Sequence, residues 1–335
     1  MNKKFLYEML KTSSPTGDEY ELQKKIIKYM DKYEVITDYT GNVISCLNTD
    51  SDYKVLLAGH VDEIAYMVSH ITDTGMIKVV NAGGVRHQLA QGRRVEVLGY
   101  KNTLKGVFGV CKGEKGINTS AKTKDLYIDL GFSEKEQVLE HIRVGDYVVY
   151  TDSVDELANN RIAGRALDNR LGAFIVIEAL KRAEKKNAKI GVYSATTVGE
   201  ESTMRGAYWA AKKIKPDFAL LVDVTFATDS PGTNPALTGK VKLDGGPVLA
   251  KGSIINKKIN SKLEEIAKDL KMDVQWEVAP GRTGTDGDKI HQSVGGVPLA
   301  LISIPLRYMQ SPSEVGSLND VEEIIELSSE ILDRI

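Results

Sequence analysis

The chain has 335 residues, of which 42% are hydrophobic and 27% are charged, and its formal net charge is −2. This length suits one large domain, or a core domain that carries a smaller one. The small net charge gives no electrostatic attraction to nucleic acid or to an anionic membrane, so neither is expected as a partner. The apolar runs are also shorter than the roughly 18 residues that a membrane-spanning helix needs.

Two features indicate the cellular compartment. The first residues lack the apolar core and the small-residue cleavage site of a signal peptide. The two cysteines, Cys46 and Cys111, suit a reducing environment, and neither has a second cysteine at metal-binding spacing. We therefore expect a cytoplasmic protein.

The chain opens with two predicted helices. Residues 5–11 have an amphipathic helical pattern. A loop over 13–21 leads into a second helix that is expected to reach about Tyr33. Thr16 is its predicted N-cap, and Glu19, three residues further on, is the predicted capping-box partner.

A hairpin and a buried strand follow. Residues 34–48 alternate around a Thr-Gly-Asn turn at 40–42, which predicts a hairpin. Residues 54–58 are an unbroken apolar run, which is typical of a strand in a sheet covered on both faces by helices.

The sequence pattern then changes between residues 67 and 159. Short β-like pieces alternate with glycine and asparagine turns, and one helix-like stretch interrupts them at 133–140. We interpret 67–159 as a small β-rich domain inserted into an α/β domain formed by residues 1–66 and 160–335.

After residue 160, helical and strand patterns alternate again. This alternation predicts an α/β fold with a mixed, largely parallel sheet sandwiched by helices. The predicted helices cover 171–184, 204–213, 261–270 and 320–335, and the predicted strands cover 189–198, 218–222 and 297–304.

Polar side chains that can bind metals follow the predicted strands. In open α/β sheets, ligands bind beyond the carboxyl ends of the strands, where side chains from distant parts of the chain meet. Imidazole and carboxylate groups gathered there would suit zinc, cobalt or manganese. The candidates are His60, Asp62, Asp168, Glu200, Glu201, Asp223 and Gln310.

Each candidate also has a simpler explanation. Glu200 and Glu201 could be turn residues facing water, His60 a hydrogen-bonded loop residue, and Asp168 a helix N-cap. Asp223 fits this explanation less well, because a carboxylate at the end of an apolar strand is costly unless a cation compensates it.

Five motifs in order along the chain carry a family resemblance. The chain resembles the co-catalytic metallo-aminopeptidases that form tetrahedral (TET) particles, also called glutamyl or deblocking aminopeptidases. The resemblance covers the whole length, including the β insertion, which in that family is a PDZ-like oligomerisation domain on a zinc-peptidase-like core. The motifs are GHVDE at 59–63, ALDNR at 166–170, GEE at 199–201, DVT at 223–225 and RYM at 307–309.

The resemblance implies a role for each candidate. His60 and Asp223 would bind one of two divalent ions, Asp168 would bridge both, and Glu201 would bind the second. Glu200 would be the general base, and Asp62 would orient His60. The ions would be zinc, cobalt or manganese, the substrates short peptides, and the assembly a large homo-oligomer such as a dodecamer. Thr285 and Asp286 would lie beside the substrate pocket.

One position departs from the family. Gln310 stands where the family has a second histidine ligand, and a neutral amide is a poorer ligand than imidazole for zinc-like ions. The second metal site would therefore be weak, be empty, or prefer a harder ion such as manganese.

Three functional hypotheses follow: an active aminopeptidase, a non-catalytic or conditionally active homologue, and, with least support, a glycoside hydrolase (endoglucanase). The sequence does not show which N-terminal residue is preferred. Basic residues near the pocket, such as Arg282 or Lys289, would favour acidic substrates.

Overall fold

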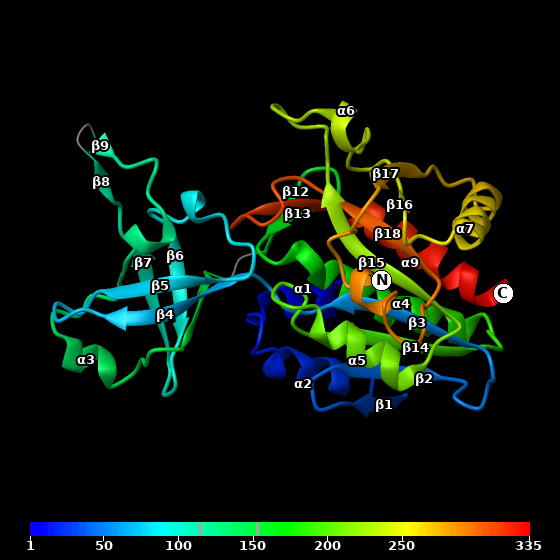
Figure 1. Cartoon of the computed structure of the whole chain (residues 1–335), viewed down its shortest axis with the longest axis horizontal. Helices are drawn as coiled ribbons and strands as arrows, with labels where there is room; N and C mark the ends of the chain where they lie inside the picture. The colour runs from blue at the N-terminus through cyan, green and yellow to red at the C-terminus, as the bar shows by residue number, and fades with distance from the viewer. Residues whose placement is uncertain (114–115, 152–153) are drawn as a thin grey trace.

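The computed structural model describes residues 1–113, 116–151 and 154–335. It has two lobes, a helix-covered sheet and a smaller β-barrel (Figure 1). The carboxyl ends of the central parallel strands point toward the barrel lobe.

The larger lobe is built on an eight-stranded mixed sheet with the order β1-β2-β14-β3-β15-β18-β16-β17. The central strands β14, β3, β15 and β18 are parallel, whereas β1, β2 and β16 introduce antiparallel pairs. The mixed, largely parallel prediction is confirmed. The strands are β1 (Glu34–Thr37), β2 (Val43–Leu47), β3 (Lys54–His60), β14 (Gly191–Thr197), β15 (Phe218–Phe226), β16 (Val248–Gly252), β17 (Gln275–Ala279) and β18 (Leu299–Leu306).

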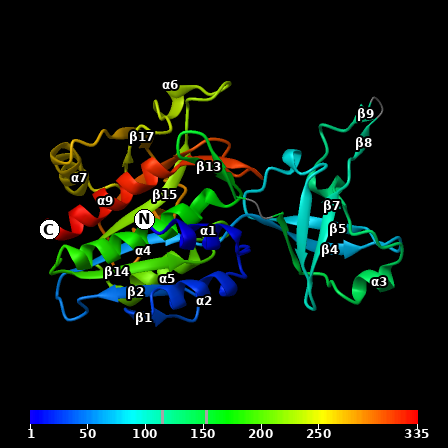
Figure 2. The ribbon, with the colours of Figure 1, turned by 180° about the vertical axis from the view of Figure 1, so that it is seen from behind.

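Helices cover both faces of this sheet, because its strands alternate apolar side chains between two cores. In β3, Val55 and Leu57 point into one core, and Leu56 and Ala58 point into the other. In Figure 2, α1 (Lys3–Lys11), α4 (Leu167–Lys185) and α9 (Leu318–Asp333) lie in front of the sheet on the first face. The side chains of α5 (Arg205–Ile214) and α8 (Gly287–Ile290) join the second core. The other helices of this lobe are α2 (Tyr20–Tyr29), α6 (Pro235–Thr238) and α7 (Lys257–Asp269).

The smaller lobe is a closed barrel with its own apolar core around Phe108 and Tyr66. A short helix, α3 (Lys135–Leu139), matches the helix-like stretch predicted at 133–140. The likeness to a PDZ domain and the exact domain boundaries stay predictions. The barrel strands are β4 (Ala65–Ile71), β5 (Ile77–Ala82), β6 (Arg94–Leu98), β7 (Thr103–Phe108), β10 (Ile128–Asp129) and β11 (Tyr147–Tyr150), and a two-stranded ribbon is formed by β8 (Lys112–Gly113) and β9 (Gly116–Ile117).

A three-stranded sheet lies beside the α/β core near the chain's return from the barrel. It consists of β12 (Val154–Leu157), β13 (Arg161–Gly164) and β19 (Glu314–Ser317). Its third strand comes from near the C-terminus, so the segment that leaves the barrel pairs with a strand far along the chain. Among the helices of the described residues, none is long and apolar enough to span a membrane.

Two local predictions were wrong. The second helix begins at Tyr20 and ends at Tyr29, and Thr16 does not cap it; the Thr16 hydroxyl instead lies 3.0 Å from the Ser202 hydroxyl. Glu19 is the N-cap residue, but its carboxylate accepts hydrogen bonds from the N–H groups of Gly17 and Gly199. A contact distant in sequence therefore replaces the local capping box.

Candidate active site

The parallel strands bring the predicted ligands to one edge of the sheet. His60 ends β3 and pairs with Thr197, the last residue of β14, so Glu200 follows only three residues beyond it. Leu221 pairs with Ala58, which places Asp223 level with His60. Asp223 does not end its strand as predicted, because pairing with β18 carries β15 on to Phe226.

His60 is the centre of a compact polar cluster. Its Nε2 atom lies 3.4 Å from an Asp168 oxygen, 3.8 Å from a Glu200 oxygen and 3.9 Å from an Asp223 oxygen. His60 is only 1% exposed, and the three carboxylates are also buried. Four side chains from four separate segments of the chain therefore converge on one point.

Asp62 supports this cluster from behind. Its carboxylate oxygen lies 3.3 Å from His60 Nδ1, and it accepts hydrogen bonds from the backbone N–H groups of Glu200 (3.0 Å) and Glu201 (3.1 Å). Burial opposes ionisation of Asp62, but the hydrogen bond with His60, the charge of His60 and the hydrogen bonds from Thr16 and the Glu200 N–H together outweigh it and lower the pKa of the carboxyl. Asp62 thus fixes both the imidazole and the turn that carries the two glutamates.

The segment that carries Asp168 is held by two buried carboxylates that the sequence analysis did not identify. Glu63 forms ion pairs with Arg165 and Arg170, which lie on either side of Asp168 in the chain. Glu314 accepts hydrogen bonds from the Asp168 N–H (3.1 Å) and from the Gln310 N–H (2.7 Å). Glu63 belongs to the GHVDE motif, so its position beside Asp62 was the available signal.

The carboxylates of the cluster are crowded in a buried site. Burial raises the pKa of Glu200 to about 10, and the neighbouring Asp223 adds to the rise. Burial also raises the pKa of Asp223 to about 8, with Asp168 contributing. Burial followed by repulsion from Asp168 raises the pKa of Glu201 well above its usual value. Burial would lower the pKa of His60, but its bonds to the carboxylates outweigh this and raise it.

The donor set fits a divalent cation. Ligand atoms of His60, Asp168 and Asp223 lie within 4.8 Å of one another, and those of His60, Glu200 and Glu201 do the same. One imidazole with several carboxylates is a donor set for zinc, cobalt or manganese. A cation there would also compensate the crowded negative charge, which otherwise favours the protonated carboxyls.

Gln310 lies beside the cluster on the side of the barrel. Its side-chain amide faces Gly84, where an added Cβ would lie 3.2 Å from the Gln310 Nε2 atom. Its backbone has a positive φ of 59°. Gln310 therefore lines the same cavity as Asp168 and Glu201, the residues of the predicted second metal site.

A cavity of about 420 Å³ opens onto the cluster. His60, Glu200 and Gln310 line one part of it, and Thr285 lines another. Asp286 lies behind Thr285: it is 2% exposed and accepts a hydrogen bond from the Thr197 hydroxyl. The cavity is therefore a substrate-sized space lined by the cluster and by further polar and apolar side chains.

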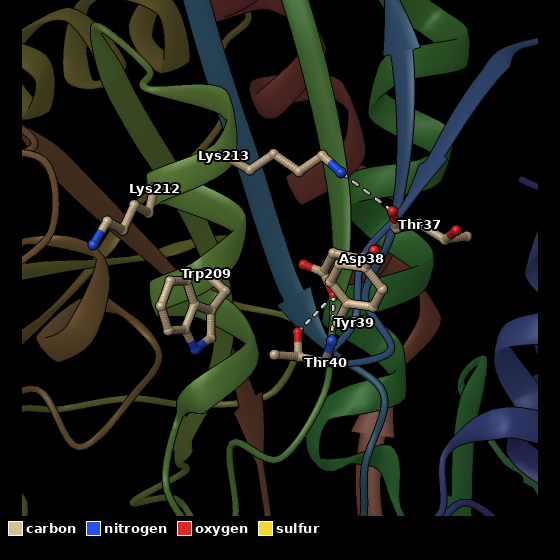
Figure 3. A pocket seen from close by; sticks show the side chains of 7 residues that line it. All are labelled: Thr37, Asp38, Tyr39, Thr40, Trp209, Lys212 and Lys213. Carbon is tan, nitrogen blue, oxygen red and sulfur yellow. Dashed lines mark hydrogen bonds between the residues drawn. The ribbon is translucent and has the colours of Figure 1, made fainter.

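A larger hollow, of about 710 Å³, lies on the surface between the β1–β2 turn and α5 (Figure 3). Trp209 and Lys213 line it, and the Lys213 amine donates to the Thr37 carbonyl. The one carboxylate in its lining, Asp38, accepts hydrogen bonds within its own turn from Thr40. Its lining, as far as the structure describes it, contains no cluster of metal-binding side chains, so the smaller cavity is the better candidate.

Comparisons with known proteins show which family the chain is similar to. The model of the M42 glutamyl aminopeptidase family matches residues 41–327. A putative aminopeptidase of Acetivibrio thermocellus is 33% identical over 99% of this chain and 100% of its own length. A TET aminopeptidase from a marine sediment archaeon of the Thaumarchaeota has a TM-score of 0.94 at 30% identity, covering 99% of this chain and 96% of its own.

Two further solved structures bear on assembly and on activity. The TET1 peptidase of Pyrococcus horikoshii, described as assembling into a tetrahedron or an octahedral shell, has a TM-score of 0.88 at 28% identity and covers 99% of both chains. A Thermotoga maritima structure named an endoglucanase has a TM-score of 0.79 at 28% identity, covering 98% of this chain and 96% of its own. The family match, the relative above 30% identity and the shared architecture lead to one conclusion: the chain belongs to the M42 glutamyl aminopeptidase family, a family of peptidases.

Proposed function

We propose that this protein is a metal-dependent aminopeptidase that releases N-terminal residues from short peptides. The observation that supports this most directly is the buried His60 imidazole with Asp168, Glu200 and Asp223 within 4 Å of its Nε2 atom, beside a cavity of about 420 Å³. Membership of a peptidase family gives the reaction class.

The chain's own residues divide the work of the site. His60, Asp168 and Asp223 would hold one divalent ion. Asp168 would share a second ion with Glu201, whose ligand atom lies within 4.8 Å of those of His60 and Glu200. Bound ions of this kind polarise the scissile carbonyl and make water a stronger nucleophile. Gln310 offers only a neutral amide oxygen to the second ion, so we propose that this site binds its ion more weakly than the first.

Glu200 is the proposed general base. Its carboxylate would take a proton from the attacking water and return it to the leaving amine. This role requires the ionised form, whereas burial raises the pKa of Glu200 to about 10. Cations held by the neighbouring ligands favour the ionised form, so the base would be competent only in the metal-loaded protein.

The proposal also includes self-association into a large homo-oligomer, such as a dodecamer. We assign residues 67–159 to a PDZ-like oligomerisation domain and residues 1–66 and 160–335 to the catalytic domain. The support is the similar Pyrococcus horikoshii structure, described as assembling into closed shells. Light scattering should then give a mass near that of twelve 36.8-kDa chains, and a monomer at every metal concentration would contradict the assignment. A cytoplasmic location, without nucleic-acid or membrane partners, remains our prediction.

Peptide hydrolysis by metal-stripped and reloaded protein tests the main proposal. We expect N-terminal residues to be released from free peptides, but not from N-acetylated ones, and only with added zinc, cobalt or manganese. Glu200→Gln should lower the rate by roughly 10²- to 10⁴-fold, the usual contribution of a general base, while metal content stays unchanged. Glu264→Gln, an exposed change on α7 of the α/β lobe, is the matched control.

Other outcomes separate the alternatives. Full activity after metal removal would contradict the mechanism. Metal binding without release from any peptide would support the non-catalytic hypothesis. Cleavage of β-glucan oligosaccharides, with peptides left intact, would instead support the glycoside hydrolase.

A further inference from the structure

Glu277 places a negative charge in the cavity wall, apart from the metal-binding cluster. It lies on β17 and lines the same cavity as His60. Its carboxylate accepts a hydrogen bond from the Ser303 hydroxyl at 2.5 Å and another from the Thr225 side chain. Ser303 pairs with Asp223 across β15 and β18, so this carboxylate lies over the sheet face that carries a predicted metal ligand.

The Glu277 carboxylate has hydroxyl donors but no ion-pair partner in the part of the chain that the structure describes. Within residues 1–113, 116–151 and 154–335, no basic side chain forms an ion pair with Glu277. Burial raises the pKa of Glu277, and the hydroxyls of Ser303 and Thr225 only partly offset that rise. Glu277 is partly buried, and a partly buried carboxylate with hydroxyl donors alone would gain from a partner that brings positive charge.

The basic residues near the cavity do not create an opposing preference for acidic substrates. Arg282 lines the cavity, but its guanidinium pairs with Asp288 at 3.2 Å and the side chain is 79% exposed. Lys289 lies on α8 and is not a lining residue. The nearby Lys251 amine lies over the Trp276 ring, 3.6 Å from its centre. The expectation that Arg282 or Lys289 selects acidic substrates therefore finds no support here.

The cavity also has apolar walls. Leu301, Met309 and Phe226 line it together with Val278. Such walls suit the methylene stem of a long side chain whose charged end continues to a polar group. Lysine and arginine have this combination of an apolar stem and a cationic tip.

We propose that Glu277 determines specificity by accepting the cationic tip of an N-terminal lysine or arginine side chain. This inference rests on the proposed function, because the α-amino end of the substrate must lie at the His60 cluster. It adds a substrate class, basic N-terminal residues, to that function.

The test compares two substrates that differ in one charge. Lysine and norleucine 4-nitroanilides have similar stems, and only lysine carries the amine. For the metal-loaded protein we expect kcat/KM for lysine to exceed that for norleucine by roughly 10- to 100-fold, the range for a hydrogen bond to a charged group. Glu277→Gln should reduce this ratio toward one, and Glu277→Lys should shift the preference toward glutamate. Glu264→Gln, an exposed change on α7 that does not line this cavity, should keep the natural ratio.

The possible failures are distinguishable. A natural protein that cleaves norleucine as well as lysine would overturn the inference and leave the proposed function intact. A Glu277→Gln variant that loses activity equally on both substrates would show a structural role and also overturn it. Absence of cleavage of every substrate at all metal concentrations would overturn the proposed function, and this inference with it.

Discussion

The Asp62 carboxylate accepts a hydrogen bond from the backbone N–H of Glu200 at 3.0 Å. The same carboxylate lies 3.3 Å from His60 Nδ1 and accepts the Glu201 N–H. One fully buried side chain therefore sets the distance between the imidazole and the turn that carries the proposed base. Such partners of metal-binding residues orient the ligands and adjust their basicity.

We therefore expect Asp62→Asn to weaken metal binding by roughly 10- to 100-fold, as is typical when such a partner is changed. An amide has only one acceptor oxygen, so it cannot keep all three interactions of Asp62. Titration calorimetry with zinc or manganese measures the effect. Asp52→Asn, an exposed change, is the matched control, and equal affinity in both variants would show that Asp62 does not orient the site.

Much of the site could be predicted from the sequence, because its residues follow apolar strands. His60 and Glu200 come directly after such strands, and Gln310 follows another. The parallel order of β14, β3, β15 and β18 then brings these ends together. Strand-end position and sheet topology were sufficient for these residues.

Other parts of the site could not be predicted in this way. Glu277 and Glu314 lie in short strands whose sequence pattern does not indicate that either carboxylate belongs to the site. Glu314 is buried because β19 joins a three-stranded sheet with β13, a pairing distant in sequence. The capping box at Thr16 was wrong for a related reason, since the Gly199 N–H, far along the chain, donates to Glu19. The burial of Glu314 and the cap of the second helix therefore both depend on backbone hydrogen bonds between residues far apart in the sequence.

A second prediction concerns the departure from the family pattern. Gln310→His should raise the occupancy of the second metal site, because imidazole is a stronger ligand than an amide for zinc-like ions. Metal analysis by mass spectrometry should change from near one ion per chain toward two, and peptide turnover should rise. If the natural protein already holds two ions per chain, Gln310 is not limiting.

A third prediction concerns stability and pH at α9. Asp320 is fully buried and accepts the N–H groups of Asp244 and Gly246. Burial raises its pKa to about 7 from the usual 3.8. The folded state therefore favours the protonated carboxyl, and its contribution to stability is complete below about pH 4 and is lost as the pH rises through 7.

Asp320→Asn should remove that pH dependence. The free energy of unfolding of the natural protein, relative to the variant, should fall between pH 4 and pH 7 by at most roughly 1.4 kcal/mol per pH unit. Thermal unfolding across this range measures the difference. The exposed change Asp333→Asn is the control, and parallel pH profiles for the natural protein and Asp320→Asn would refute the assignment.

The last prediction concerns the close approach of β3 and α4 behind His60. An added Cβ at Gly59 would lie 2.6 Å from the Gly172 carbonyl carbon and 2.7 Å from the Ala173 nitrogen. These are backbone atoms, so Gly59→Ala must push strand and helix apart, at a cost of about 1–3 kcal/mol. We expect a thermal midpoint lower by several degrees and weaker metal binding, because His60 moves with the strand. Gly281→Ala, where an added Cβ meets nothing within 4 Å, should change neither, and equal midpoints for the two variants would show that this contact is not tight.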